Sequence, residues 1–200
     1  ELNGGIGDSC YEIGCGFYNP INLCFCDTIC VDYGDLHMMY AQPGQSDTLY
    51  ASTGYGRPHG IAEMVEGNAG VFRSEDGGAS WEYAWKGITP RYSRPMCIDH
   101  RPPHGLTVAC APTAFSSHKD EGGAGAMLLR SEDHGKSWRS LCDKAHTPSK
   151  GNIHGLAIDR EYVGGVVIGT DDGEVWRISD DAKWTAQADK LPAVLSAITI

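Results

Sequence analysis

The chain has 200 residues, with 26 acidic against 16 basic side chains and a formal net charge of −10. Proteins bind a nucleic-acid backbone through clustered Lys and Arg, so this charge argues against a nucleic-acid partner and is typical of a solubilising surface. The 26 glycines and 10 prolines fit many short strands joined by turns, and the apolar runs are too short to cross a bilayer. We therefore expect a β protein without a transmembrane segment.

The first 34 residues are rich in cysteine. Five of the eight cysteines lie there, at Cys10, Cys15, Cys24, Cys26 and Cys30. Disulfides are the first interpretation and a metal cluster the second, and the odd count leaves one thiol over. Disulfides favour a secreted or periplasmic location over the cytoplasm. Cys97 and Cys110 fall in predicted strands, where unpaired cysteine is usually a small buried apolar residue.

From residue 35 onwards, apolar segments of strand character recur in a fixed order. The segments that match one another as first strands are 37–41, 94–99 and 154–159, and those that match as second strands are 47–53 and 165–170. A third apolar stretch follows at Gly70–Arg73 and again at Met127–Arg130. Such self-similarity indicates a repeat fold in which each unit packs on its neighbours.

A polar motif follows each of these third stretches. Ser74-Glu75-Asp76-Gly77-Gly78-Ala79-Ser80-Trp81 returns as Ser131-Glu132-Asp133-His134-Gly135-Lys136-Ser137-Trp138. Ser and Asp side chains bond to nearby backbone amides, Gly supplies positive φ and Trp packs on the sheet, so the motif predicts a hairpin turn. A degenerate third copy, Ser179–Trp184, is two residues shorter between Asp and Trp and lacks the Gly. We expect it to form a tighter turn.

The pattern Ser-x-Asp-x-Gly-x-x-Trp after Phe-Arg or Leu-Arg resembles the Asp-box (BNR) repeat of sialidase-like β-propellers. Propellers of photosystem II assembly factors and of sortilin-type receptors are similar. The resemblance implies an all-β propeller of four-stranded antiparallel blades. It also implies a structural role for the residues of the two complete boxes, which are Ser74, Asp76, Gly78, Trp81, Ser131, Asp133, Gly135 and Trp138.

The repeat divides the chain into blades. We expect blades at 35–92, 93–152 and 153–192, the first strand of a further blade at 193–200, and in residues 1–34 a Cys-rich segment or the end of a preceding blade. Propellers have about 4–8 blades, so these units predict a partial propeller. Further sequence or another chain would complete it, and a small closed form is the alternative.

Strand direction predicts a shared polar face. In an antiparallel blade, the start of the first strand and the loop between the second and third strands lie on one face, and the Asp-box turns lie on the other. This places two long loops beside the strand starts. The candidate metal ligands are His37, His59, His118 and His154, and the candidate ligand-binding residues are Tyr55, Arg57, Glu63 and Arg94; Glu66, Asp120 and Glu121 share the rim.

Three interpretations of this face stay open. Imidazoles and carboxylates together could hold a divalent metal ion, which would act as a Lewis acid or lower the pKa of a bound water. An Arg between two His could instead grip a carboxylate or phosphate. In the third interpretation, these side chains only satisfy backbone carbonyls around a wet axial channel.

Three functional classes follow. A non-catalytic binding or assembly propeller, with a protein partner or a small-molecule or glycan ligand, needs no catalytic set and is favoured. A metal-dependent enzyme would use the His-rich rim. A glycoside hydrolase is implied by the resemblance alone. Sialidases use an arginine triad and a Tyr-Glu pair, and Arg94 could be one member of such a triad. The Arg-Ile-Pro element of sialidases is absent from this sequence.

Overall fold

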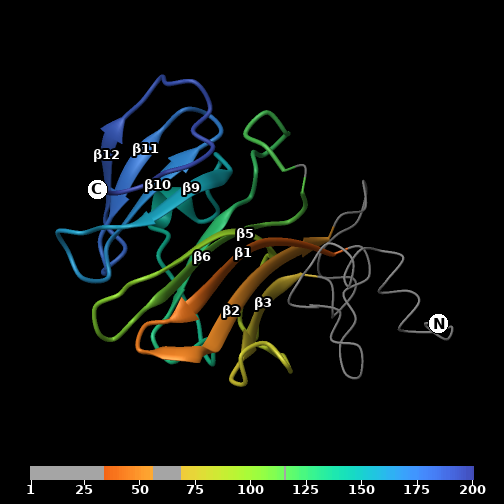
Figure 1. Cartoon of the computed structure of the whole chain (residues 1–200). Coiled ribbons are helices and arrows are strands. Elements are labelled where there is room, and N and C mark those ends of the chain that lie inside the picture. Colours follow the sequence, from red (N-terminus) through yellow and green to blue (C-terminus); the bar gives the residue numbers. More distant parts are fainter. Residues whose placement is uncertain (1–33, 56–68, 115) are drawn as a thin grey trace, which may run out of the picture.

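The fold is built from three four-stranded antiparallel sheets (Figure 1). The computed structural model describes residues 34–55, 69–114 and 116–200. Within these ranges the helical structure is limited to one 3-10 turn at Lys144–His146. No helix of this part of the chain is long and apolar enough to cross a membrane. The all-β class predicted from the sequence is confirmed.

Each sheet takes its strands in chain order. The first sheet contains β1 (Gly34–Gln42), β2 (Gln45–Tyr55), β3 (Gly70–Ser74) and β4 (Glu82–Tyr83). The second contains β5 (Tyr92–Ile98), β6 (Leu106–Ala111), β7 (Met127–Ser131) and β8 (Arg139–Ser140). The third contains β9 (Ile153–Ile158), β10 (Val166–Thr170), β11 (Val175–Ile178) and β12 (Trp184–Ala188).

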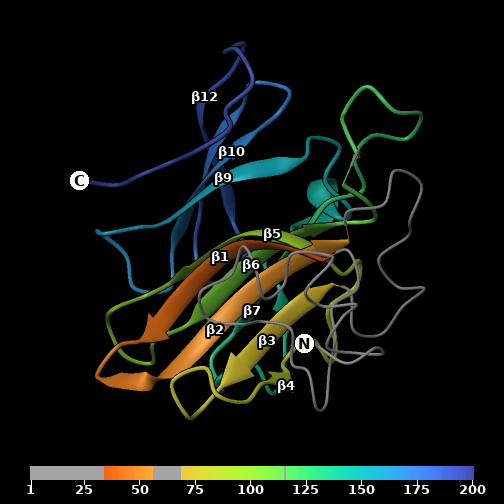
Figure 2. The same ribbon diagram turned by 45° about the vertical axis from the view of Figure 1, so that its right-hand side comes forward.

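The sheets follow one another around their first strands. β5 lies against β1 and β2, and β9 lies against β5. The outer strands β4 and β8 have only two residues each, and both residues are exposed in each of them. Figure 2 shows the three sheets fanning out from the side where β1, β5 and β9 approach one another. This radial arrangement of blades confirms the predicted partial propeller.

The hydrophobic core lies between neighbouring sheets. Between the first and second sheets, buried side chains include Tyr50, Val71, Met96, Leu106 and Val108. Between the second and third sheets they include Leu128, Leu141, Ile153, Ile168 and Trp184. A single sheet therefore buries its apolar face only when the next one is present, as expected for a repeat fold.

The two complete Ser-x-Asp turns have the same hydrogen bonds. The Ser74 hydroxyl accepts from the Gly78 amide at 2.8 Å, and Asp76 Oδ1 accepts from the Ser80 amide at 2.8 Å. The second turn repeats both bonds at 2.8 Å, from Gly135 to Ser131 and from Ser137 to Asp133. His134, at a φ of 63°, takes the left-handed position that Gly77 holds in the first turn.

The degenerate third turn closes more tightly, as its shorter spacing predicts. The Ser179 amide donates to the carbonyl of Lys183 at 3.1 Å, and the Ala182 amide donates to the carbonyl of Ser179 at 2.9 Å. Ala182 has a φ of 62°, so a residue with a side chain supplies the left-handed position here.

Backbone carbonyls link each sheet to the next. Trp138 Nε1 donates to the Ala84 carbonyl at 2.7 Å, and Trp184 Nε1 donates to the Leu141 carbonyl at 2.8 Å, in each case in the segment that follows the preceding sheet. Arg130, which is 2% exposed, reaches forward and donates to the Gly164 carbonyl at 3.1 Å. The turn residues thus bind neighbouring blades together as well as closing their own hairpins.

Residues 193–200 lie along the third sheet. The Val194 amide donates to the Thr170 carbonyl, and Thr199 Oγ1 donates to the Ile158 carbonyl, both at 2.9 Å. The segment pairs as a strand with nothing in the described part of the chain. Its role as the first strand of a further blade stays a prediction.

The cysteines of the described residues are free thiols. Cys97 and Cys110 are buried, as expected, and Cys142 is partly buried. Burial raises the pKa of Cys97 to about 12. The five amino-terminal cysteines lie outside the described residues.

Candidate functional site

The three first strands are each irregular at the same place. In β1 the register shifts at His37, between the pairs Leu36–Thr53 and Met38–Ser52. In β5 the register shifts across Arg94 and Pro95, and in β9 it shifts across His154. A β-bulge bends its strand and redirects the extra side chain, and bulges are common next to binding sites. The residues singled out from the sequence as strand starts are therefore all bulge residues.

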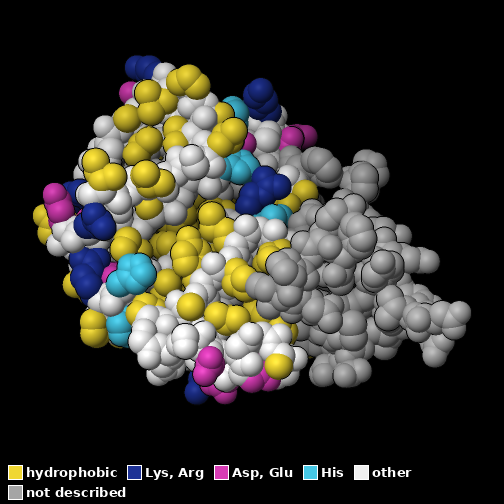
Figure 3. Space-filling view, in the orientation of Figure 1, with side chains coloured by type: hydrophobic (Ala, Val, Ile, Leu, Met, Phe, Trp, Pro, Cys, Tyr) yellow, Lys and Arg dark blue, Asp and Glu magenta, His cyan; other side chains and the backbone are white. Residues whose placement is uncertain are grey.

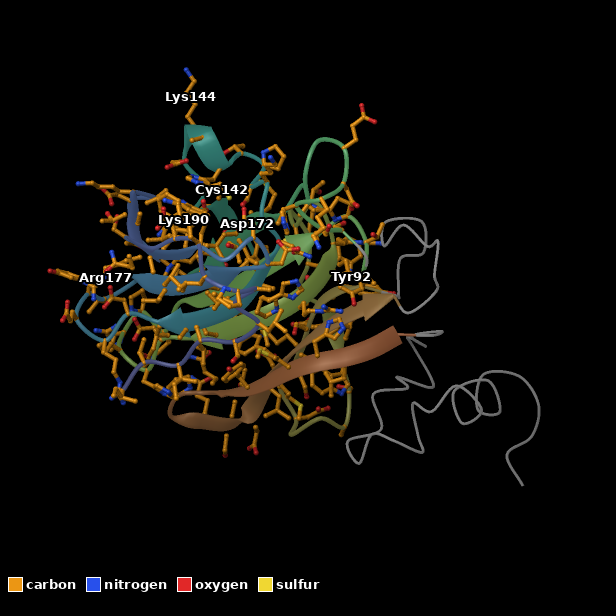
Figure 4. All side chains as sticks on the ribbon, turned by 90° about the horizontal axis from the view of Figure 1, so that it is seen from above. Tyr92, Cys142, Lys144, Asp172, Arg177 and Lys190 are labelled. Carbon is orange, nitrogen blue, oxygen red and sulfur yellow. The ribbon has the colours of Figure 1, made fainter. Side chains whose placement is uncertain are left out.

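Tyr92 joins His37 to Arg94. His37 Nδ1 lies 2.7 Å from the Ser93 carbonyl, so this nitrogen carries the proton and donates. His37 Nε2 then accepts from the Tyr92 hydroxyl at 3.2 Å, and the same hydroxyl accepts from Arg94 Nη2 at 3.0 Å. The first and second blades thus share one hydrogen-bonded chain. Figure 4 labels Tyr92, which lies near one end of the first two sheets.

Gly54 makes room for this chain. A Cβ atom at this position would lie 2.3 Å from Tyr92 Cε2 and 2.5 Å from His37 Cε1. Both distances are far inside van der Waals contact. A glycine at the end of β2 is therefore required for Tyr92 and His37 to meet.

The third blade contributes His154. Burial lowers the pKa of His154, the positive charge of Arg94 lowers it further, and Asp171 acts in the opposite direction. The imidazole is therefore neutral at pH 7 and can both donate and accept hydrogen bonds. A small cavity of about 10 Å³ lies between the second and third blades, lined by Tyr92, Arg94, Asn152 and Ile153 among others.

The loop between β6 and β7 is tied to the third blade. Asn152, which is 8% exposed, donates through Nδ2 to the Ser116 carbonyl at 2.7 Å. His118 Nδ1 lies 3.3 Å from Asp171 Oδ1, which also accepts from the Asn152 amide at 2.8 Å. These contacts place His118 next to the start of β9. Asp120 and Glu121 lie exposed in the same loop.

The structure brings together part of the residue set expected from the sequence. His37 and Arg94 meet through Tyr92, and His118 lies 3.3 Å from Asp171, whose negative charge acts to raise the pKa of His154. Figure 3 shows histidine and basic side chains close together beside the region drawn in grey. Arg57, His59, Glu63 and Glu66 lie outside the described residues, as does the side chain of Tyr55.

The metal site stays a prediction. Among the residues that the structure describes, no group of three or more His, Cys, Asp or Glu side chains is placed to hold a metal ion. His37 is engaged by Ser93 and Tyr92, and His118 by Asp171. His59, the fourth predicted ligand, is outside the described part.

Four residues of the site were missed from the sequence: Gly54, Tyr92, Asn152 and Asp171. Tyr92 precedes Arg94 by two residues, so strand alternation alone could have placed the two side chains on one face. Nothing in the local sequence indicates that Asn152 and Asp171 meet a loop of the neighbouring blade.

No protein-family model matches the chain, and no curated protein matches it either. Solved structures do match. The structure titled "YCF48 bound to D1 peptide" has a TM-score of 0.50 and 15% identity, and the match covers 80% of this chain and 41% of that one. The GH74 enzyme of Niastella koreensis has a TM-score of 0.53 and 13% identity, with coverage of 77% and 22%. The GH74 xyloglucanase of Xanthomonas campestris has a TM-score of 0.51 and 14% identity, with coverage of 76% and 21%.

The chain spans less than half the length of these similar structures. At such low identity the likeness concerns the fold and does not extend to activity. The three antiparallel sheets of this chain are blades of a β-propeller.

Proposed function

We propose that this chain is a non-catalytic binding or assembly β-propeller of the BNR/Asp-box type, with a partner on the face where the first strands begin. One observation carries the proposal: β1, β5 and β9 shift register at His37, Arg94 and His154, and the Tyr92 hydroxyl hydrogen bonds to both His37 and Arg94. A β-bulge disrupts the pairing of its strand, so bulges at equivalent positions weaken all three first strands. A polar binding site formed by the side chains at these bulges would account for them.

The chemistry of this face suits an acidic group. Arg94 uses one guanidinium nitrogen on Tyr92 within the described residues, which leaves further N–H donors for a ligand. Its neighbour His154 is neutral at pH 7 and offers another hydrogen bond. A guanidinium with nearby imidazoles fits a carboxylate of a partner protein. The similar propeller structure titled as bound to a D1 peptide supports a peptide as the partner.

Fluorescence polarisation with labelled 12-residue peptides of acidic, neutral and basic composition tests the proposal. We expect the acidic peptides to bind and Arg94→Gln to weaken them about tenfold, since a charge-assisted hydrogen bond contributes about 1.5–3 kcal/mol. The double variant His37→Ala/His154→Ala should fold and lose binding. Glu121→Gln, exposed on the same loop-bearing face, is the control. Equal affinity of the wild type and Arg94→Gln would refute the site.

Glycoside hydrolysis is the second candidate, because two of the similar structures are GH74 enzymes. Release of reducing sugar from xyloglucan by the purified chain would support hydrolysis and would displace the binding proposal.

Metal analysis of the same sample tests the metal-dependent alternative. In that case the wild type should hold stoichiometric metal, and His37→Ala/His154→Ala should not.

A further inference from the structure

The opposite face of the propeller, where the Ser-x-Asp turns lie, carries a hollow of about 250 Å³ at the second turn. It lies beside the outer strand β8 and is open to solvent. Its lining combines an aromatic ring with both signs of charge: Arg130, Glu132, Asp133, Ser137, Trp138 and Arg139. Ligand pockets for drug-sized molecules start at about 300 Å³, so this hollow suits a smaller molecule.

The wall and floor of the hollow are fixed in place. The bond from Trp138 Nε1 to the Ala84 carbonyl at 2.7 Å holds the half-buried indole. Arg130 at the floor donates to the Gly164 carbonyl at 3.1 Å and to Glu132 Oε1 at 3.2 Å. A ligand would therefore meet a preorganised surface, which lowers the ordering cost of binding.

Glu132 and Arg139 at the rim of the hollow have unused hydrogen-bonding capacity. Glu132 and Arg139 are 43% and 41% exposed and lie 3.1 Å apart. Both bonds that Glu132 accepts among the described residues end on Oε1, so Oε2 is available. Arg139 donates to Glu132 and Asp180 through its two Nη atoms, and its Nε–H makes no bond in that part of the chain.

The hydrogen bond from Arg139 lowers the pKa of Glu132, with a smaller contribution in the same direction from Arg130. Glu132 is therefore ionised at neutral pH, and the rim holds two opposite charges side by side. Glu132 also pairs with Arg130, and Arg139 also pairs with Asp180, so neither charge depends on the other alone. A zwitterion can therefore place an ammonium group on Oε2 of Glu132 and a carboxylate on the Nε–H of Arg139 without breaking these pairs.

We propose that this hollow binds the zwitterion of a free α-amino acid with an apolar side chain. The ammonium group donates to Glu132, the carboxylate accepts from Arg139, and the side chain packs against Trp138. This site is separate from the loop-bearing face and does not depend on the partner proposed there.

The first turn provides an internal comparison. It repeats Arg73, Glu75 and Trp81, but Glu82 stands where the second turn has Arg139. Glu75 and Glu82 are 67% and 62% exposed, and both pair with the buried Arg73. This turn presents carboxylates without an exposed guanidinium, so it should not bind a zwitterion.

Isothermal titration calorimetry and saturation-transfer NMR on the whole chain test the proposal with L-phenylalanine and L-leucine as probes. Two analogues each lack one charge: 3-phenylpropionate has no ammonium group and 2-phenylethylamine has no carboxylate. We expect saturable binding of both amino acids and about tenfold weaker binding of each analogue. Methyl β-D-glucoside, a neutral ring of similar size, should not bind.

Arg139→Gln and Glu132→Gln should each weaken L-phenylalanine about tenfold, while the matched control Glu82→Gln at the first turn should leave the affinity unchanged. Thermal unfolding of each variant verifies that it is folded. The absence of saturable binding to the wild type would overturn the proposal, as would unchanged affinity in Glu132→Gln. Binding of the glucoside in place of the amino acids would overturn the zwitterion assignment.

Discussion

Trp138 Nε1 donates a hydrogen bond to the carbonyl oxygen of Ala84, 2.7 Å away in the preceding blade. Trp184 makes the equivalent bond to Leu141 at 2.8 Å, whereas Trp81 donates to Gly78 within its own turn at 3.1 Å. In the second and third turns, the Trp ring that closes the turn is thus also the contact that orients it against the preceding sheet.

Trp138→Phe should separate these two roles. It keeps an aromatic ring but leaves the buried Ala84 carbonyl without its donor, so we expect a loss of about 1–2 kcal/mol in the free energy of unfolding. Trp138→Ala also removes the packed ring and should cost about 3–5 kcal/mol. Urea unfolding monitored by circular dichroism measures both. The matched control is Trp81→Phe, and equal losses for Trp81→Phe and Trp138→Phe would contradict the bridging role.

Asp133 predicts how the second turn responds to acid. Burial acts to raise its pKa, but the hydrogen bonds from Ser137 and Ser131 outweigh burial and lower the pKa to about 2. A carboxyl with a lowered folded-state pKa stabilises the protein above its unfolded pKa of about 3.9, and this stability is lost as the pH falls towards 2. Asp133→Asn should therefore lower the melting temperature at pH 7.

The difference in melting temperature between Asp133→Asn and the wild type should narrow as the pH falls from 4 towards 2. Differential scanning fluorimetry across that range measures it. Glu121→Gln, at an exposed carboxylate in the loop between β6 and β7, is the control for general acid effects. A difference that stays constant down to pH 2 would show that the charge of Asp133 is unimportant.

The turns could be predicted from sequence because their chemistry is local. Ser131 and Asp133 bond to amides within the same few residues, so the motif carries its own structure. The bulges could not be predicted in this way. His37 and His154 look like ordinary strand residues, and their displacement from the register depends on how each first strand pairs with the second. Long-range pairing of that kind leaves no periodic signal in the sequence.

Cys97 should resist thiol reagents in the folded protein. Its thiol is buried, and burial raises its pKa to about 12, so the reactive thiolate is scarce at pH 8. Iodoacetamide labelling followed by peptide mass spectrometry should leave Cys97 unmodified without denaturant and modify it fully in 6 M urea. Rapid native labelling of Cys97 would mean that the sheet opens on the time scale of the experiment.

Gly54→Ala should displace the Tyr92 and His37 rings of the polar face. The added Cβ would collide with the Tyr92 and His37 rings, and overpacking of this kind costs about 1–3 kcal/mol. We expect lower stability and a changed NMR environment for the His37 ring.

A double-mutant cycle assigns the cause. Tyr92→Ala removes the nearest ring atoms, so Gly54→Ala should cost less in that background than in the wild type. Purely additive losses would mean that the added Cβ does not act through the Tyr92 ring. The hydrogen-bonded chain from His37 to Arg94 orients Arg94. A smaller loss for Gly54→Ala in the Tyr92→Ala background would therefore connect Gly54 of the first blade to the acidic-partner site proposed on the second blade.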